Sequence, residues 1–91
     1  MSHPLYVAFI WHQHQPLYKS RVAGGYRLPW VRLHGIKDYL DLVLLLEEYP
    51  KLHQTVNLVP SLILQIEDYV NGLAVDPYLD VTLKPMDQLD W

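Results

Sequence analysis

The chain has 91 residues, of which 51% are hydrophobic and 19% charged, with a net charge of -3 and no cysteine. This length predicts one globular domain, residues 1–91, without an internal boundary. The weak negative charge argues against nucleic acid as a partner, because that binding depends on neutralising phosphates. Disulfides and thiolate metal sites are excluded, and no apolar run approaches the roughly 20 residues of a membrane span. We therefore expect a cytoplasmic protein that binds neither nucleic acid nor membranes.

The first predicted element is a strand over residues 5–11, a continuously apolar run rich in β-branched and aromatic residues. Such a run predicts a strand buried on both faces, as in a parallel sheet. A polar, turn-rich segment follows from about residue 12 to residue 33. Because connections of this length are usually functional or disordered, the segment is a candidate for a site.

A helix is predicted from Gly35 to the residues before Pro50, since proline disfavours helical backbone in the residue that precedes it. Its apolar positions recur with helical spacing, at Ile36, Tyr39, Leu40, Val43 and Leu46. A second strand is predicted over residues 54–59.

Pro60 suits the first turn of a second helix, and Asn71-Gly72 suits its C-terminal cap. The predicted apolar face of this helix is Leu62, Ile66, Tyr69 and Leu73. After Asp76 we expect irregular structure until residues 84–89, which resemble the first turn of a third helix.

The predicted order is strand, loop, helix, strand, helix. Alternation of this kind predicts an α/β fold with parallel strands and outer helices. Two parallel strands do not form a complete sheet, and a strand that is apolar throughout needs cover on both faces. We therefore expect the chain to be the first β-α-β-α units of a larger barrel-like enzyme.

The residues at the end of the first predicted strand, His12, His14 and Gln15, are the best candidates for chemistry. A period of two places the histidines on one face, and strand ends line the active site in such folds. Three interpretations are open: hydrogen-bonded loop residues without a ligand, a pair of metal ligands, or a site for a polar uncharged ligand such as a sugar. The loop favours a sugar, because its aromatic rings can stack on pyranoses and its arginines add donors; these residues are Trp11, Tyr18, Tyr26, Trp30, Arg21, Arg27 and Arg32.

Four segments in order resemble glycoside hydrolase family 57, and most closely its α-amylases and amylopullulanases. They are His14-Gln15-Pro16, residues 29–39, residues 57–62 and residues 76–79. The resemblance implies an incomplete (β/α)7 barrel that acts on α-glucans or maltooligosaccharides without a cofactor, by hydrolysis or transfer. It also implies a retaining mechanism with a glutamate nucleophile and an aspartate acid/base.

By the same resemblance, His14 would bond the sugar beside the scissile bond, and Gln15 would shape that wall. His12, Trp30 and His34 are further substrate-binding candidates. No Asp or Glu follows either predicted strand, and the carboxylates of the helices are expected to point away from a barrel mouth. We therefore predict that the chain holds no catalytic residue and no metal ligand, and is inactive alone.

Two alternatives to an enzyme fragment stay open. One is a freestanding carbohydrate-binding or assembly module that self-associates through exposed strand edges and apolar helix faces. The other is a fragment of a metal-dependent barrel hydrolase that uses His12 and His14 as ligands.

Overall fold

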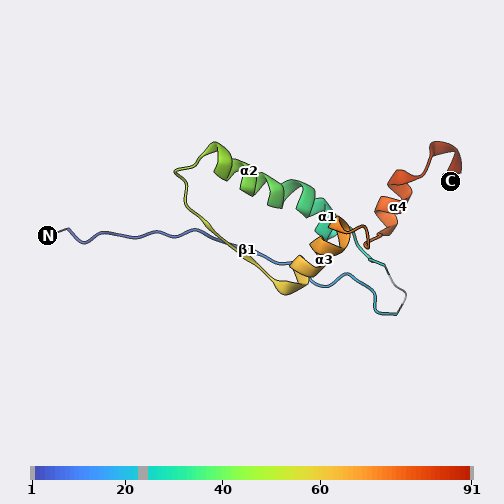
Figure 1. The fold of residues 1–91 in the computed structure, drawn as a ribbon, viewed down its shortest axis with the longest axis horizontal. Coiled ribbons are helices and arrows are strands. Elements are labelled where there is room, and N and C mark those ends of the chain that lie inside the picture. The colour runs from blue at the N-terminus through green and yellow to red at the C-terminus, as the bar shows by residue number, and fades with distance from the viewer. Residues whose placement is uncertain (1, 23–24, 91) are drawn as a thin grey trace.

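The computed structural model describes residues 2–22 and 25–90. The molecule is elongated, with extents of 72 × 29 × 24 Å and a radius of gyration of 18.3 Å. Its N-terminal segment extends away from the body without a neighbouring segment among the described residues (Figure 1). None of the helices in the described part of the chain has the length and apolar character needed to cross a membrane. The elements in order are β1 (Ile10–Gln13), α1 (Trp30–His34), a π-helical turn (Gly35–Tyr39), α2 (Leu40–Glu48), β2 (Thr55–Leu58), α3 (Pro60–Val70), α4 (Pro77–Leu83) and a 3-10 turn (Met86–Gln88).

The two strands pair in parallel, with Ile10 beside Thr55 and His12 beside Asn57. Parallel pairing needs a crossover connection, which α1, the π-helical turn and α2 provide. The predicted α/β class with parallel strands is therefore confirmed, whereas two strands cannot test the predicted barrel.

The prediction for the first strand was wrong in position and in burial. β1 begins at Ile10 rather than residue 5, because β2 offers partners only to residues 10–13. Residues 5–9 lie before this pairing and are exposed, and within β1 only Gln13 is buried. The strand expected to be buried on both faces is thus largely exposed, because the described residues form a sheet of only two strands.

The first helical segment is longer than predicted. It begins at Trp30, five residues before the predicted start at Gly35, and continues through the π-helical turn into α2. Its end agrees with the prediction: α2 stops at Glu48, and Tyr49 leaves the helical region with φ -119° and ψ 72° directly before Pro50.

The predicted start and cap of α3 are confirmed. Pro60 is in its first turn, and Gly72, with φ +69°, follows the C-cap residue Asn71. The Leu73 N–H donates to the Asp68 carbonyl at 2.8 Å, and the Gly72 N–H donates to the Tyr69 carbonyl at 3.2 Å. These two bonds form a Schellman motif, which ends the helix.

Only part of the predicted apolar face of α3 is covered. Leu62 is fully buried, and Ile66 and Tyr69 are half-buried. Leu73 is exposed because it lies beyond the cap, where the chain has turned away from the helix axis.

The predicted irregular structure after Asp76 was wrong, because a helix, α4, occupies residues 77–83. The Asp76 side chain accepts from the Leu79 N–H at 2.8 Å, and Pro77 occupies the first turn, so the helix has a standard N-terminus. The helix predicted over residues 84–89 is only the 3-10 turn Met86–Gln88.

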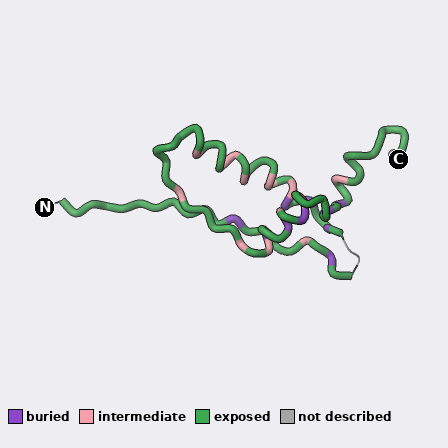
Figure 2. The backbone as a smooth tube through the Cα atoms, viewed as in Figure 1, coloured by how far each residue is buried: buried purple, intermediate pink, exposed green. Residues whose placement is uncertain are grey.

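The core is small and lies where the loop after β1 meets α1 and α3 (Figure 2). Its most completely buried side chains are Leu62, Gln65, Val31 and Asp76, so two of the four are polar. In the described residues every buried side-chain nitrogen and oxygen has a hydrogen-bond partner. The core is therefore held by hydrogen bonds between buried polar groups as well as by apolar packing.

Candidate functional site

The two histidines at the end of β1 lie side by side, as predicted. Their rings are 5.9 Å apart between centroids and stack with 29° between their planes. His12 Nδ1 donates to the Asn57 side-chain oxygen at 2.7 Å, across the pairing of β1 with β2. A proton held on Nδ1 leaves Nε2 with the lone pair, so the ring can accept a hydrogen bond from a hydroxyl group.

Gln15 is held between two tyrosines. Its amide nitrogen donates to the Tyr39 hydroxyl at 3.1 Å, and its oxygen accepts from the Tyr18 hydroxyl at 2.7 Å. Burial, together with the nearby Tyr39, raises the pKa of Tyr18, so this hydroxyl stays protonated and remains a donor. Because its oxygen accepts from Gln15, Tyr39 can use its own proton to donate elsewhere.

The backbone after His14 is fixed by two side chains of α3. The Ser61 hydroxyl donates to the Gln15 carbonyl at 2.8 Å. The Gln65 amide donates to the Pro16 carbonyl at 2.9 Å, and its oxygen accepts from the Tyr18 N–H at 2.8 Å. Residues 57–62, which the sequence marked as a motif, thus adjoin the histidine motif in space.

Trp30 and His34 lie one helical turn apart, at the start of the long helical segment. Their ring centroids are 6.1 Å apart, and the His34 ring is also 6.1 Å from the Tyr39 ring. The His34 ring pairs with Asp38 at 2.5 Å. Tyr39 therefore joins Trp30 and His34 to Gln15, a link that the sequence did not reveal because Tyr39 read as one of the apolar positions of its helix.

An open cavity of about 450 Å³ lies between the end of β1 and the helix beside it. It is lined by Trp11, His12, Gln13, His14, Asp38, Tyr39, Asp41, Leu42 and Leu45. Of the predicted site residues, the structure places His12 and His14 in this lining. Gln15 contacts the lining residue Tyr39, His34 contacts the lining residues Tyr39 and Asp38, and Trp30 contacts His34.

Two acidic residues of this lining correct an expectation. Asp38 and Asp41 face the same cavity as the histidines, although the sequence predicted that helical carboxylates point away from the site. The π-helical turn and the start of α2 run beside the end of β1, which brings these two exposed carboxylates to the rim of the cavity. Each carboxylate is held by a residue four positions earlier on its helix: Asp38 by His34, and Asp41 by Lys37 at 2.8 Å.

Among the residues that the structure describes, the histidine pair does not belong to a larger group of metal-ligating side chains. Within residues 2–22 and 25–90, no three His, Cys, Asp or Glu side chains come together in a way that could hold a metal ion. The metal-dependent alternative would therefore need ligands from elsewhere in addition to His12 and His14.

The sequence model of Glycosyl hydrolase family 57 matches residues 8–91. The chain belongs to Glycosyl hydrolase family 57. Searches of curated proteins and of solved structures gave no significant match. The matched residues include every candidate named above.

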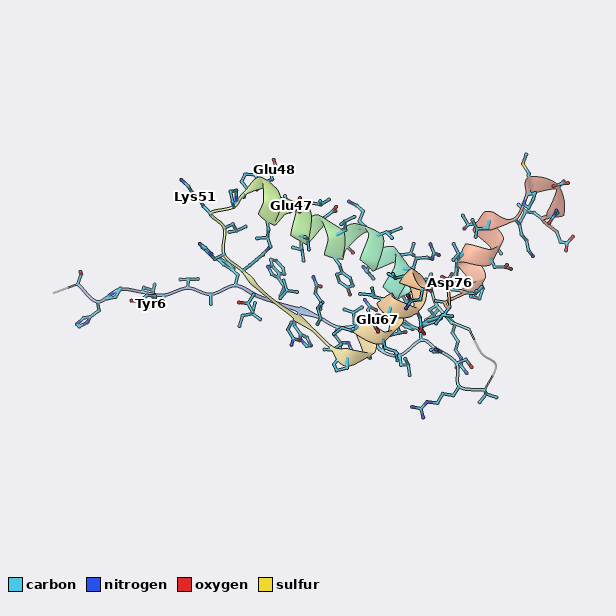
Figure 3. All side chains as sticks on the ribbon, in the orientation of Figure 1. Tyr6, Glu47, Glu48, Lys51, Glu67 and Asp76 are labelled. Carbon is cyan, nitrogen blue, oxygen red and sulfur yellow. The ribbon has the colours of Figure 1, made fainter. Side chains whose placement is uncertain are left out.

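Two buried carboxylates hold the rest of this family 57 chain around the motif. Asp76 pairs with Arg32 at 3.0 Å and accepts from the Tyr69 hydroxyl at 2.8 Å, which joins α1, α3 and α4 (Figure 3). Burial opposes ionisation of Asp76, but the bonds from Arg32, from the Leu79 N–H and from Tyr69 hold its pKa below the ordinary value. Arg32, expected as a donor to a sugar, is thus engaged within the protein.

Asp68 makes the equivalent contacts one helical turn past Gln65. It accepts from Lys19 at 2.8 Å and from the Tyr26 hydroxyl at 2.6 Å, and these bonds hold its pKa below the ordinary value. Burial and the bond to Asp68 raise the pKa of Tyr26 in turn. Tyr26, expected as a stacking platform for a sugar, is buried and has a structural contact instead.

Proposed function

We propose that the chain is the amino-terminal part of a retaining glycoside hydrolase or glucanotransferase that acts on α-glucans. In this proposal it supplies one wall of the substrate site in an incomplete (β/α)7 barrel of the α-amylase and amylopullulanase type, in the cytoplasm, and the catalytic carboxylates lie outside residues 1–91. The observation that carries the proposal is the family match over a segment in which His14-Gln15-Pro16 directly follows β1 beside an open cavity.

The chemistry of this wall suits a neutral sugar. Imidazole, amide and phenol groups both donate and accept hydrogen bonds, as sugar hydroxyls do, and none of them needs a charged partner. His12, His14 and Tyr39 present such groups to one cavity, and the Trp11 ring adds an apolar face for a pyranose. The carboxylates Asp38 and Asp41 could accept from further hydroxyls.

The test is the affinity of the complete gene product for maltohexaose, measured by isothermal titration calorimetry. We expect His14→Ala to weaken binding about ten-fold, because the loss of a hydrogen bond worth about 1.4 kcal/mol changes the dissociation constant by that factor. The matched control is His53→Ala, which removes an exposed histidine in the turn before β2. Equal affinity of the His14→Ala variant and the wild-type protein would contradict the proposal.

A second measurement addresses catalysis. The purified 91-residue chain should release no reducing sugar from amylose and transfer no glucose units, because a retaining pair of carboxylates must flank one bond at about 5 Å. Hydrolysis or transfer by this chain, with contaminating amylase excluded, would show that Asp38 or Asp41 has a catalytic role that we do not assign.

Self-association is the second candidate function. It is favoured by the open edges of the sheet and by large apolar side chains that lie exposed along residues 5–10. A monodisperse small oligomer that binds maltohexaose would support a freestanding module, and an aggregating or unfolded chain would support the fragment.

A further inference from the structure

Gln65 is a buried amide whose hydrogen-bonding groups are directed at the histidine motif. Its side chain is 0% exposed, although it lies in the middle of α3. Its nitrogen donates to the carbonyls of Pro16 and Ser61, at 2.9 and 2.8 Å, and its oxygen accepts from the Tyr18 N–H at 2.8 Å. Both ends of the amide are thus occupied, and two of the three bonds cross to the loop.

These bonds replace secondary structure in the loop. The segment after β1 has no strand partner at Gln15, Pro16 or Leu17, and Pro16 has no N–H to donate. Ser61 bonds the Gln15 carbonyl, and Gln65 bonds the Pro16 carbonyl and the Tyr18 N–H. A polypeptide segment held at three backbone groups within four residues has little freedom left, so the side chains that it carries also have fixed origins.

We propose that Gln65, with Ser61, is a positioning residue for sugar binding in the proposed function, on which this inference rests. By fixing the backbone of residues 15–18, the pair sets the position of His14 at the cavity and of the Gln15 side chain that bonds to Tyr39. Gln65 itself is covered by protein and does not touch the ligand. The amide of Gln65 is required because one side chain must both donate to the Pro16 carbonyl and accept from the Tyr18 N–H.

The experiment uses the complete gene product and two readouts, the dissociation constant for maltohexaose and the midpoint of thermal unfolding. Gln65→Leu keeps the volume but leaves both loop groups without their partners, and Ser61→Ala removes only the bond to Gln15, which Ser61→Thr restores. The matched control is Asp68→Asn, on the same helix, which weakens the contact with Lys19 and leaves the motif untouched.

We expect Gln65→Leu to weaken maltohexaose binding about ten-fold or more, and Ser61→Ala roughly three-fold, because a displaced wall loses hydrogen-bond geometry. Ser61→Thr should bind as the wild-type protein does. Asp68→Asn should lower the unfolding midpoint and leave the affinity of the folded protein unchanged. A purely structural role for Gln65 would instead lower the midpoint alone.

The outcomes separate this inference from the proposed function. If His14→Ala weakens binding while Gln65→Leu and Ser61→Ala do not, the positioning role is wrong and the proposed function stands. If the wild-type protein does not bind maltohexaose, or His14→Ala binds equally well, both fail. If Gln65→Leu does not fold, the comparison of Ser61→Ala with Ser61→Thr decides, since either substitution leaves Gln65 in place.

Discussion

The two ends of the molecule differ in how they are held. At the packed end, residues 15–19 bond to side chains of α3. The buried Asp76, directly before α4, bonds to Arg32 of α1 and Tyr69 of α3 (Figure 3). At the open end, residues 2–9 extend beyond β1 and past the end of α2, away from the body (Figure 3), and Tyr6 is 87% exposed. Val43 of α2 is also 54% exposed. Within the described residues, the buried polar groups thus find hydrogen-bond partners, whereas many apolar side chains stay exposed.

The difference indicates which interactions this segment can satisfy alone. A buried hydrogen bond needs one partner at one distance, which a nearby helix can supply. A strand that is apolar on both faces needs whole layers of structure, and these are not formed by the two strands and the helices described here. The packed end should therefore keep its structure by itself, and the open end should associate.

Loss of the Asp76 carboxylate should have the largest effect on the stability of the packed end. Asp76→Ala leaves the Arg32 guanidinium and the Tyr69 hydroxyl without their acceptor and removes the N-cap of α4. Breaking a buried pair in this way should lower the free energy of unfolding by about 3 kcal/mol. Urea unfolding followed by circular dichroism measures this, with the exposed Asp87→Ala as the control, which should stay within about 0.5 kcal/mol.

The pH dependence of the same variant gives an internal check. The pKa of Asp76 is lowered from its ordinary value of 3.8, so its contribution to stability is present above that pH and is lost as pH falls through the lower folded value. The difference between wild-type protein and Asp76→Ala should therefore be constant at neutral pH and shrink in strong acid. A difference that persists unchanged at low pH would show that packing, not charge, is responsible.

The open end gives the second prediction, on association rather than folding. Val7→Lys and Phe9→Lys place charge on an exposed apolar segment next to an unpaired strand edge. We expect the wild-type chain to self-associate and the double variant to be largely monomeric in sedimentation velocity, because charged side chains block edge-to-edge pairing. Gln88→Lys, on the exposed 3-10 turn, is the control for added charge. A wild-type chain that is monomeric at high concentration would contradict this.

Local signals in the sequence predicted several element boundaries correctly, and the packed end shows why. Pro50 and Pro60 mark a helix end and a helix start because proline constrains φ and lacks an N–H, whatever the rest of the fold does. Gly72 marks the cap for an equally local reason. The same kind of signal, Asp76 followed by Pro77, also marks the start of α4.

Contacts between distant segments could not be predicted in this way. Gln65 and Ser61 read as ordinary polar positions of α3, and only the fold shows that they meet a loop more than 40 residues earlier. The π-helical turn has no clear signature in the sequence, and it contains Asp38 and Tyr39, the residues that approach the histidine motif. The sequence therefore predicted His12, His14 and Gln15 as candidate site residues, but not the side chains of other elements that bond to this segment.

The smallest expected effects on stability come from substitutions at two glycines, one at the packed end and one in the helical segment that leads to the open end. Gly72 caps α3 at the packed end with φ +69°, and Gly35 lies in the helical segment that leads to the open end, with φ -60°. At both positions no atom of the described residues that could obstruct an added Cβ lies within 4 Å, so backbone conformation alone should decide the outcome.

Alanine should therefore have opposite effects at the two positions. Gly72→Ala forces an L side chain into the left-handed region and should lower the free energy of unfolding by about 1 kcal/mol. Gly35→Ala removes chain entropy from the unfolded state and should raise it by about 0.5 kcal/mol. Each variant serves as the control for the other in urea unfolding. Destabilisation by both would mean that the π-helical turn needs its glycine, and that the helix leading to the open end is more constrained than its exposure indicates.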